Sequence, residues 1–398
     1  MSSTVEKIWF TRCPVPTASG LAYNLGWLDE EFGEVGVLQD AGPELAEHHF
    51  DHRLLGLFRE GGNVPALVAR SEGARTRLIG LTWIEEWQSI LVRPESGVTG
   101  AAGLRGARVA LPRWAGTRAR SFPRAMALHG IKGALSQAGL TVDDVTFVEV
   151  DQPEPGVGRD ATGRAHTWPG LRELADGAVD AVYVKGARSA EQAREIGAVV
   201  AVDLDAHPDR RTRVNNGTPR PITVHEDLLT EHPDLVVAFL TRTLRAADWA
   251  AGNLEAVRGI LAAETRSGAE GVTAAYRGDF HRNLHPDLSR ERLDLLRVQK
   301  DFLLLHGFLA ADVDVEAWAA YEPLATARAR LAAEAEGGAA PGREGETAQG
   351  PGAGPAREPE PLTGEGRAEH EAAAGREGGA VRERAAGEPA LASGKAAR

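Results

Sequence analysis

The sequence predicts an α/β fold with two lobes, in which mainly parallel sheets are covered by helices. Along residues 1–330, short runs rich in Val, Ile and Leu alternate with segments of helical periodicity. This alternation is typical of β-α-β units, which bind ligands in a crevice at the carboxyl ends of their strands. The length of 398 residues and the hydrophobic content of 42% are enough for more than one domain with a real core.

The expected elements follow one another in a regular order. The first helix, residues 18–28, places Leu21, Leu25 and Leu28 on one face. Gly177 ends a later helix just before the strand AVDAVYV. The expected strands are residues 7–10, 35–40, 76–83, 89–94, 104–112, 145–150, 178–184, 197–204 and 221–229. Residues 54–59 lie between the second of these strands and the helix at Pro65, and Gly61 and Gly62 are expected to end a helical turn there. The expected helices are 18–28, one that begins at Pro65, 130–137, 171–177, 233–252, 267–276 and 288–305.

Composition excludes several classes of protein. A formal charge of -12 argues against a surface for nucleic acid or for an anionic membrane. A single cysteine excludes an intramolecular disulfide framework. We see no signal peptide at the N-terminus and no apolar run of the length needed to span a bilayer, so we expect a cytoplasmic protein, and a monomer.

The C-terminal part of the chain, residues 334–398, has a different composition. It contains almost no Leu, Ile, Val or aromatic residue. Such a segment cannot bury enough apolar surface to offset its conformational entropy. We therefore predict a disordered, low-complexity tail and assign it no function.

The only cysteine, Cys13, lies in the motif RCPVP between a strand and a helix. Each proline biases the residue before it toward extended geometry, and Thr17 or Ser19 can cap the helix that follows. The thiol is then expected close to a helix N-terminus, which lowers its pKa. A small buried hydrophobic residue is the alternative interpretation of a lone cysteine.

A second motif, REGGNVP, is expected to form an anion site. Gly61 and Gly62 leave backbone N–H groups unshielded where a new helix opens at Asn63 and Pro65, a geometry that binds an oxyanion. Arg59 adds a planar set of donors for the same anion. A plain corner between two helices with a solvated arginine is the alternative.

We predict neither a metal nor a cofactor. His48, His49 and His52 have the spacing H-H-x-x-H, but no further cysteine or acidic residue stands at a metal-ligand spacing. The sequence contains no Walker motif and no G-x-G-x-x-G that opens a helix after a strand.

Taken together, these motifs resemble the aromatic sulfinate desulfinases of dibenzothiophene desulfurisation. The order is a strand, C-P-V-P, a helix, H-F and then R-x-G-G-x-x-P-x-L. The resemblance implies that Cys13, His49, Arg59 and Gly62 form the active site. It also implies the fold of type 2 periplasmic solute-binding proteins, since the segments LRGARVAL, ADGAVDAVYV and HPDLVVAFLTRTLRAADWA are similar to those of the wider family.

The resemblance sets expected lobe boundaries and shows two departures. One lobe would comprise 1–112 and 222–330, and the other 113–221. An aromatic residue of the substrate pocket in these desulfinases is replaced here by Met126, although Trp114 is near in sequence. The basic stretch RWAGTRARSFPRAM is unusual beside a biphenyl and predicts a different arylsulfinate, or one with a second anionic group.

The implied reaction is hydrolytic cleavage of the C–S bond of an aromatic sulfinate, giving an arene and sulfite. Arg59 and the amides around Gly61 and Gly62 would hold the sulfinate. Cys13 would either attack sulfur or protonate the ring carbon, and His49 would orient Cys13 or set its protonation state. The main alternative is a non-catalytic ABC-transporter-type binding protein for a sulfonate, and a regulatory module is a further one.

Overall fold

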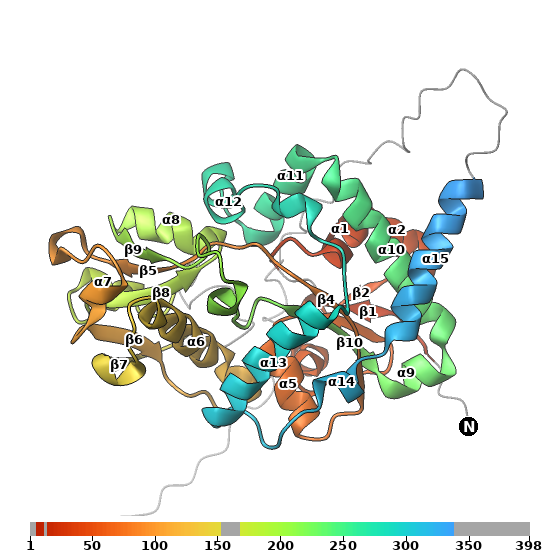
Figure 1. Ribbon diagram of the computed structural model, residues 1–398. Helices are drawn as coiled ribbons and strands as arrows, with labels where there is room; N and C mark the ends of the chain where they lie inside the picture. The colour runs from red at the N-terminus through yellow and green to blue at the C-terminus, as the bar shows by residue number, and fades with distance from the viewer. Residues whose placement is uncertain (1–4, 12–13, 153–167, 338–398) are drawn as a thin grey trace, which may run out of the picture. The chain divides into compact units, whose positions relative to one another are not determined.

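The structure is a computed structural model that describes residues 5–11, 14–152 and 168–337. All of these residues lie in one compact unit, residues 1–357. Figure 1 shows two sheets in this unit, each accompanied by its own helices. The predicted tail, residues 334–398, lies outside the described residues from residue 338 onward.

The first sheet carries the residues of interest and has five strands. In spatial order these are β2 (Gly36–Val37), β1 (Trp9–Phe10), β3 (Leu57–Glu60), β10 (Arg220–His225) and β4 (Thr76–Thr82). β1 runs parallel to β2 and β3, whereas β10 runs antiparallel to β3 and β4.

The second sheet also has five strands. Their spatial order is β7 (Thr146–Val150), β6 (Arg108–Pro112), β8 (Ala181–Lys185), β5 (Gln88–Val92) and β9 (Val199–Asp203). β6 is parallel to β7 and β8, and β5 is antiparallel to β8 and β9. Both sheets are therefore mixed rather than mainly parallel, because β5 and β10 are the strands by which the chain enters one sheet after leaving the other.

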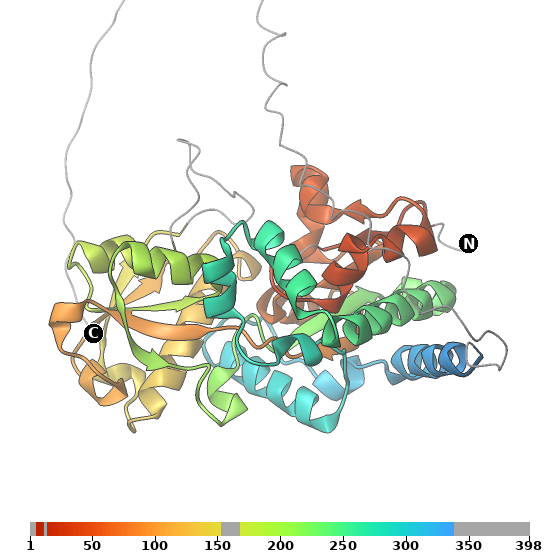
Figure 2. The ribbon, with the colours of Figure 1, turned by 90° about the horizontal axis from the view of Figure 1, so that it is seen from above.

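The helices before residue 152 are α1 (Ala18–Asn24), α2 (Trp27–Phe32), α3 (Pro43–Ala46), α4 (His48–Asp51), α5 (Asn63–Ser71) and α6 (Phe122–Ser136). Those after residue 168 are α7 (Leu171–Ala175), α8 (Ala187–Glu195), α9 (Glu226–Glu231), α10 (Pro233–Ala251), α11 (Leu254–Thr265), α12 (Ala269–Ala275), α13 (Arg290–Leu305), α14 (Val315–Trp318) and α15 (Tyr321–Gly337). α10 and α15 pack side by side (Figures 1 and 2). Among the described helices, none combines the length and the apolar character that crossing a bilayer requires.

A ring stack connects the first sheet to the longest helix of the unit. Phe58 of β3 stacks on Phe239 of α10, with ring centroids 4.1 Å apart and an angle of 10° between the planes. Both rings are fully buried, and burial of such a side chain contributes roughly 2–3 kcal/mol to folding. The stack holds β3 in place directly before Arg59.

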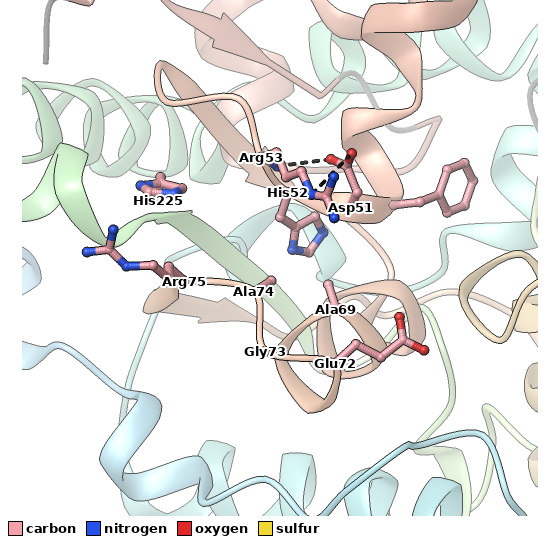
Figure 3. Close-up of a pocket in the computed structure, with 10 residues that line it drawn as sticks. Asp51, His52, Arg53, Ala69, Glu72, Gly73, Ala74, Arg75 and His225 are labelled. Atoms are coloured by element: carbon pink, nitrogen blue, oxygen red, sulfur yellow. Dashed lines mark hydrogen bonds and ion pairs between the residues drawn. The ribbon is translucent and has the colours of Figure 1, made fainter.

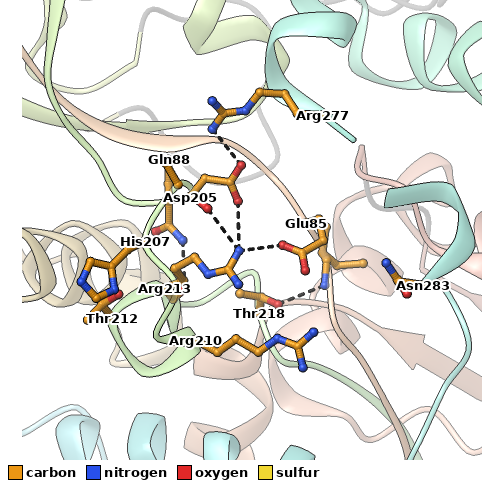
Figure 4. A network of polar contacts seen from close by, with 12 residues as sticks. Glu85, Gln88, Asp205, His207, Arg210, Thr212, Arg213, Thr218, Arg277 and Asn283 are labelled. Atoms are coloured by element: carbon orange, nitrogen blue, oxygen red, sulfur yellow. Dashed lines mark hydrogen bonds and ion pairs between the residues drawn. The ribbon is translucent and has the colours of Figure 1, made fainter. Parts of the chain in front are cut away.

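Two connecting segments pass between the sheets, residues 83–87 after β4 and residues 204–219 before β10. Arg213 of the second segment binds Glu85 of the first at 2.8 Å and Asp205 at 3.5 Å. Arg277 adds a contact to Asp205 at 2.8 Å, so that one ionic network joins the two segments (Figure 4).

Several predicted boundaries differ from the structure. The helix expected at 18–28 is divided into α1 and α2 at Gly26, whose φ of 80° is left-handed. α6 begins eight residues before the expected 130–137, and α15 extends into the segment predicted as tail. The helical turn expected before Gly61 and Gly62 is instead the strand β3, because residues 57–60 pair with β1 and β10. The strands β5 and β6 fall within the expected lobe 1–112, yet they pair in the second sheet with strands of the expected lobe 113–221. The sheets favour a boundary at residues 83–87, and the extent of each lobe stays a prediction.

Candidate active site

The predicted site residues that the structure describes lie at one edge of the first sheet. β1 and β3 are parallel and β10 runs the other way. The carboxyl ends of β1 and β3 therefore meet the start of β10 at the same edge, where α/β proteins bind ligands. Arg59 lies near the end of β3 and Arg220 begins β10.

Cys13 lies outside the described residues, but its segment is bound on both sides. Before it, Thr11 Oγ1 donates to the carbonyl oxygen of Glu60 at 2.8 Å. After it, the Ser19 hydroxyl donates to the Glu60 carboxylate. Thr17 caps α1 by accepting from the Gly20 amide at 3.1 Å, which confirms the cap predicted from the sequence. Both described flanks of the Cys13 segment are thus bound to the residue next to Arg59.

Arg59 holds the helix α4 and the glycine turn together. Its Nε donates to the carbonyl oxygen of His49 at 2.9 Å, and its Nη2 lies 3.3 Å from Nε2 of the same residue. Nη2 also donates to the carbonyl oxygen of Gly62 at 3.1 Å. The side chain is only 1% exposed. Three of the predicted site residues are therefore in direct contact.

The contact with Arg59 determines the tautomer of His49. Burial and the neighbouring guanidinium lower the pKa of His49 well below its ordinary value, so the ring is neutral at pH 7. A guanidinium can only donate, so Nε2 of the ring accepts and the hydrogen is on Nδ1. Nδ1 is buried and has no hydrogen-bond partner among the described residues. His49 consequently presents an N–H donor, and not a base, from Nδ1.

His52 forms a hydrogen bond with the backbone of His49. Its Nε2 lies 3.1 Å from the carbonyl oxygen of His49, and its φ of 58° is left-handed. Burial lowers the pKa of His52 well below its ordinary value, so the neutral ring donates from Nε2. His52 also lines a hollow of about 300 Å³ with Arg53, Arg75 and His225 (Figure 3). Asp51 and Glu72 line it as well, so charged groups of both signs surround this hollow.

The glycine turn leaves one amide available. The N–H of Gly61 donates to Pro221, that of Asn63 to the carbonyl oxygen of Asn216 and that of Val64 to Oδ1 of Asn216, at 3.3, 2.8 and 2.9 Å. The N–H of Gly62 donates to no atom of the described residues. The expectation of free amides around both glycines is therefore corrected for Gly61, because β10 lies alongside and uses its N–H.

Gly61 and Gly62 are each approached so closely by another side chain that a Cβ would not fit. A Cβ on Gly61 would lie 2.8 Å from Cζ of Arg59, and one on Gly62 would lie 2.4 Å from Oδ1 of Asn216. The guanidinium is thus packed flat against the Gly61 backbone. Asn216 is held where it caps α5.

Glu60 is a residue of this edge that the sequence reasoning missed. It is 1% exposed and accepts from Ser19 and, at 2.8 Å, from Thr82 Oγ1. Burial raises the pKa of its carboxyl, although these two hydrogen bonds act in the opposite direction. A charged residue directly before a Gly-Gly pair was the available signal.

The basic stretch after β6 is neutralised by the protein itself. Its arginines pair with carboxylates as follows: Arg113 with Glu149 and Asp151, Arg118 with Glu72, Arg120 with Glu47, and Arg124 with Glu149. Trp114 stacks on Phe308 with centroids 4.4 Å apart. These contacts remove the argument for a second anionic group on the substrate.

The other histidine of the motif has a local partner. His48 Nδ1 is 2.8 Å from Asp51. Within the part of the chain that the structure describes, no three His, Cys, Asp or Glu side chains are grouped so that they could hold a metal ion.

Comparison with known proteins confirms the resemblance predicted from the motifs. The chain is 28% identical to the 2'-hydroxybiphenyl-2-sulfinate desulfinases of Rhodococcus erythropolis and Rhodococcus qingshengii, over 81% of this chain and 93% of theirs. No protein-family model matches the chain.

Solved structures agree with this similarity. A cysteine-to-serine mutant of the enzyme DSZB in complex with biphenyl-2-sulfinic acid is 26% identical, with a TM-score of 0.68 over 81% of this chain and 99% of that one. The sulfonate-binding protein SsuA of Methylobacillus flagellatus KT is 16% identical, with a TM-score of 0.61 over 83% and 96%. The predicted two-lobed α/β fold of the periplasmic-binding-protein type is therefore confirmed.

Proposed function

We propose that the protein is a desulfinase that hydrolyses the C–S bond of an aromatic sulfinate to an arene and sulfite. The observation that carries this proposal is the direct contact of His49, Arg59 and Gly62 at the edge of the first sheet where the carboxyl ends of β1 and β3 meet the start of β10. Similarity to desulfinases of 2'-hydroxybiphenyl-2-sulfinate, one of which was crystallised with a biphenyl sulfinic acid, supports an aromatic sulfinate as substrate.

Arg59 and the Gly62 amide would bind the sulfinate oxygens. The amides on either side of Gly62 already have protein acceptors, which supports Gly62 N–H as the donor for a ligand. A buried guanidinium supplies charge from the same side of the turn. Donors fixed in this way stabilise charge on oxygen without reorganisation, which is why they outperform water.

Cys13 would act on the reacting centre. The contacts of Thr11 and Ser19 with Glu60 support its placement beside Arg59, and the related DSZB complex was obtained with a cysteine replaced by serine. In one route its thiolate would attack sulfur while the C–S bond breaks and the ring carbon takes a proton, and water would then release sulfite from the thiol–sulfonyl intermediate. In the other its thiol would protonate the ring carbon that bears sulfur, which expels SO2 that water converts to sulfite.

His49 would serve as a hydrogen-bond donor. With Nε2 occupied by Arg59, the Nδ1–H is the group that can meet a thiolate or a sulfinate oxygen. A donor at this position stabilises the thiolate and so lowers the pKa of the thiol.

A binding protein without catalysis is the second candidate. Structural likeness to SsuA supports a sulfonate or a similar anion as its ligand, although at 16% identity it shows the fold alone. Such a protein has no need of a reactive thiol beside the anion.

One assay separates the two candidates. Purified full-length protein is incubated with 2'-hydroxybiphenyl-2-sulfinate and with smaller arylsulfinates, and sulfite and arene are measured. The proposal predicts equal amounts of both products from at least one sulfinate. Absence of sulfite from every substrate, together with tight sulfonate binding in calorimetry, would establish the binding protein instead.

A further inference from the structure

A buried carboxylate, Glu86, is shared by side chains from two other parts of the chain. It lies in the connecting segment 83–87 and is 7% exposed. Lys185, at the carboxyl end of β8, forms an ion pair with its Oε2. Tyr276, which follows α12 and is 1% exposed, has its hydroxyl 3.3 Å from Oε1. Charges so deeply buried are retained only where they are paired.

The hydroxyl of Tyr276 reaches a second acceptor, the carbonyl oxygen of Pro14, at 3.4 Å. A phenol has one hydrogen, and the paired carboxylate and the carbonyl can only accept, so the two acceptors share it. Burial and the charge of Glu86 raise the pKa of Tyr276 well above its ordinary value, which keeps that hydrogen in place. Pro14 directly follows Cys13 in the sequence.

Lys185, the other member of the ion pair, lies against the loop that contains Asn216 and Gly217. A Cβ on Gly217 would be 2.7 Å from Nζ of Lys185, so the ammonium packs against this backbone. The preceding residue, Asn216, caps α5 beside Gly62. Glu86 therefore connects two parts of the proposed site. Through Tyr276 it contacts Pro14, and through Lys185 it contacts the loop of Asn216, which caps α5 beside Gly62.

We propose that Tyr276, held by the Glu86–Lys185 pair, is a positioning residue that anchors the Pro14 end of the reactive segment during desulfination. This role rests on the proposed function. The anchoring itself concerns only the backbone at Pro14 and can be measured without any substrate.

The test compares Tyr276→Phe with wild type. This variant keeps the buried ring and removes only the hydroxyl. Tyr321→Phe is the matched control, because the Tyr321 side chain is 45% exposed and its hydroxyl binds the Glu316 carboxylate away from the site. Hydrogen–deuterium exchange of peptides that cover residues 11–19 reports the anchoring. Sulfite release from 2'-hydroxybiphenyl-2-sulfinate gives kcat and KM.

We expect severalfold faster exchange in residues 11–19 of Tyr276→Phe, unchanged exchange elsewhere, and a kcat lower by about 10-fold or more. KM should stay within about twofold, because the anion donors are untouched. The control should match wild type in both measurements. Unchanged exchange, or faster exchange with unchanged kcat, would overturn this role alone. Wild-type protein that releases no sulfite would remove the proposed function, and this role with it.

Discussion

The side chain of Arg59 is bound twice to His49, through Nε to its carbonyl oxygen at 2.9 Å and through Nη2 to its ring nitrogen Nε2 at 3.3 Å. A planar guanidinium can make both contacts from one edge, and this arrangement orients the ring as well as the backbone. The pair therefore connects the proposed anion site with Nδ1–H of His49, which we propose as the donor to the reacting centre.

Replacement of Arg59 by lysine should break this arrangement. An ammonium keeps the charge but cannot reach the carbonyl oxygen, the ring nitrogen and the Gly62 carbonyl together. We expect kcat/KM for sulfite release to fall about 100-fold. Arg53→Lys is the control, since the Arg53 side chain is 82% exposed. Equal losses in the two variants would contradict a specific role for Arg59.

The tautomer of His49 can be tested with two amide side chains. The amide nitrogen of asparagine comes near the position of Nδ1, whereas that of glutamine comes near Nε2. Because Nδ1 is the donor and Nε2 accepts from Arg59, His49→Asn should retain more activity than His49→Gln. Steady-state rates of sulfite release measure which of the two variants is more active. Equal or higher activity in His49→Gln would contradict the donor role of Nδ1.

A methyl group at Gly62 should displace Asn216. Its Cβ would approach the Asn216 side chain to 2.4 Å, and Asn216 would then lose the Val64 amide. We expect the free energy of unfolding of Gly62→Ala to fall by about 1–3 kcal/mol and sulfinate binding to weaken. At Gly100 a Cβ meets nothing within 4 Å, so Gly100→Ala is the control in urea unfolding and calorimetry. Unchanged unfolding free energy and unchanged sulfinate binding in Gly62→Ala would mean that the turn accommodates a Cβ at this position.

A buried histidine outside the site should make the protein sensitive to acid. Burial lowers the pKa of His129 from 6.5 to about 3, so the unfolded chain binds a proton that the folded chain excludes. Its contribution is complete above pH 6.5 and is lost as the pH falls toward 3. Between pH 7 and pH 5, wild type should lose about 2 kcal/mol more than His129→Phe, which keeps the stack on Phe302. If urea unfolding shows that wild type and His129→Phe lose the same free energy of unfolding between pH 7 and pH 5, the lowered pKa of His129 is contradicted.

Sequence reasoning succeeded where a local pattern controls the outcome. Apolar runs placed strands such as β4 and β8, and the Thr17 cap followed from the prolines before it. The Arg-x-Gly-Gly spacing brought Arg59 and Gly62 into contact because both belong to one turn. The resemblance then supplied His49, which no local pattern connects to Arg59.

Other features depend on contacts distant in sequence and had no local signal. The Gly61 amide was expected to be free, but β10 arrives more than 150 residues later and takes it. Burial of the Glu60 carboxylate and of Glu86 could not be predicted locally, because the partners that stabilise them, Thr82 and Lys185, come from other elements. The arginines around Trp114 indicated an anionic ligand until their carboxylate partners were known.

The most direct test compares wild type with Cys13→Ser in one experiment. Sulfite release from 2'-hydroxybiphenyl-2-sulfinate and binding of a non-cleavable arylsulfonate by calorimetry are measured on both proteins. We predict that the serine variant binds the sulfonate as wild type does but releases almost no sulfite, since the thiol reacts while Arg59 and Gly62 bind. Sulfite release at the wild-type rate from Cys13→Ser would contradict a site built around this thiol.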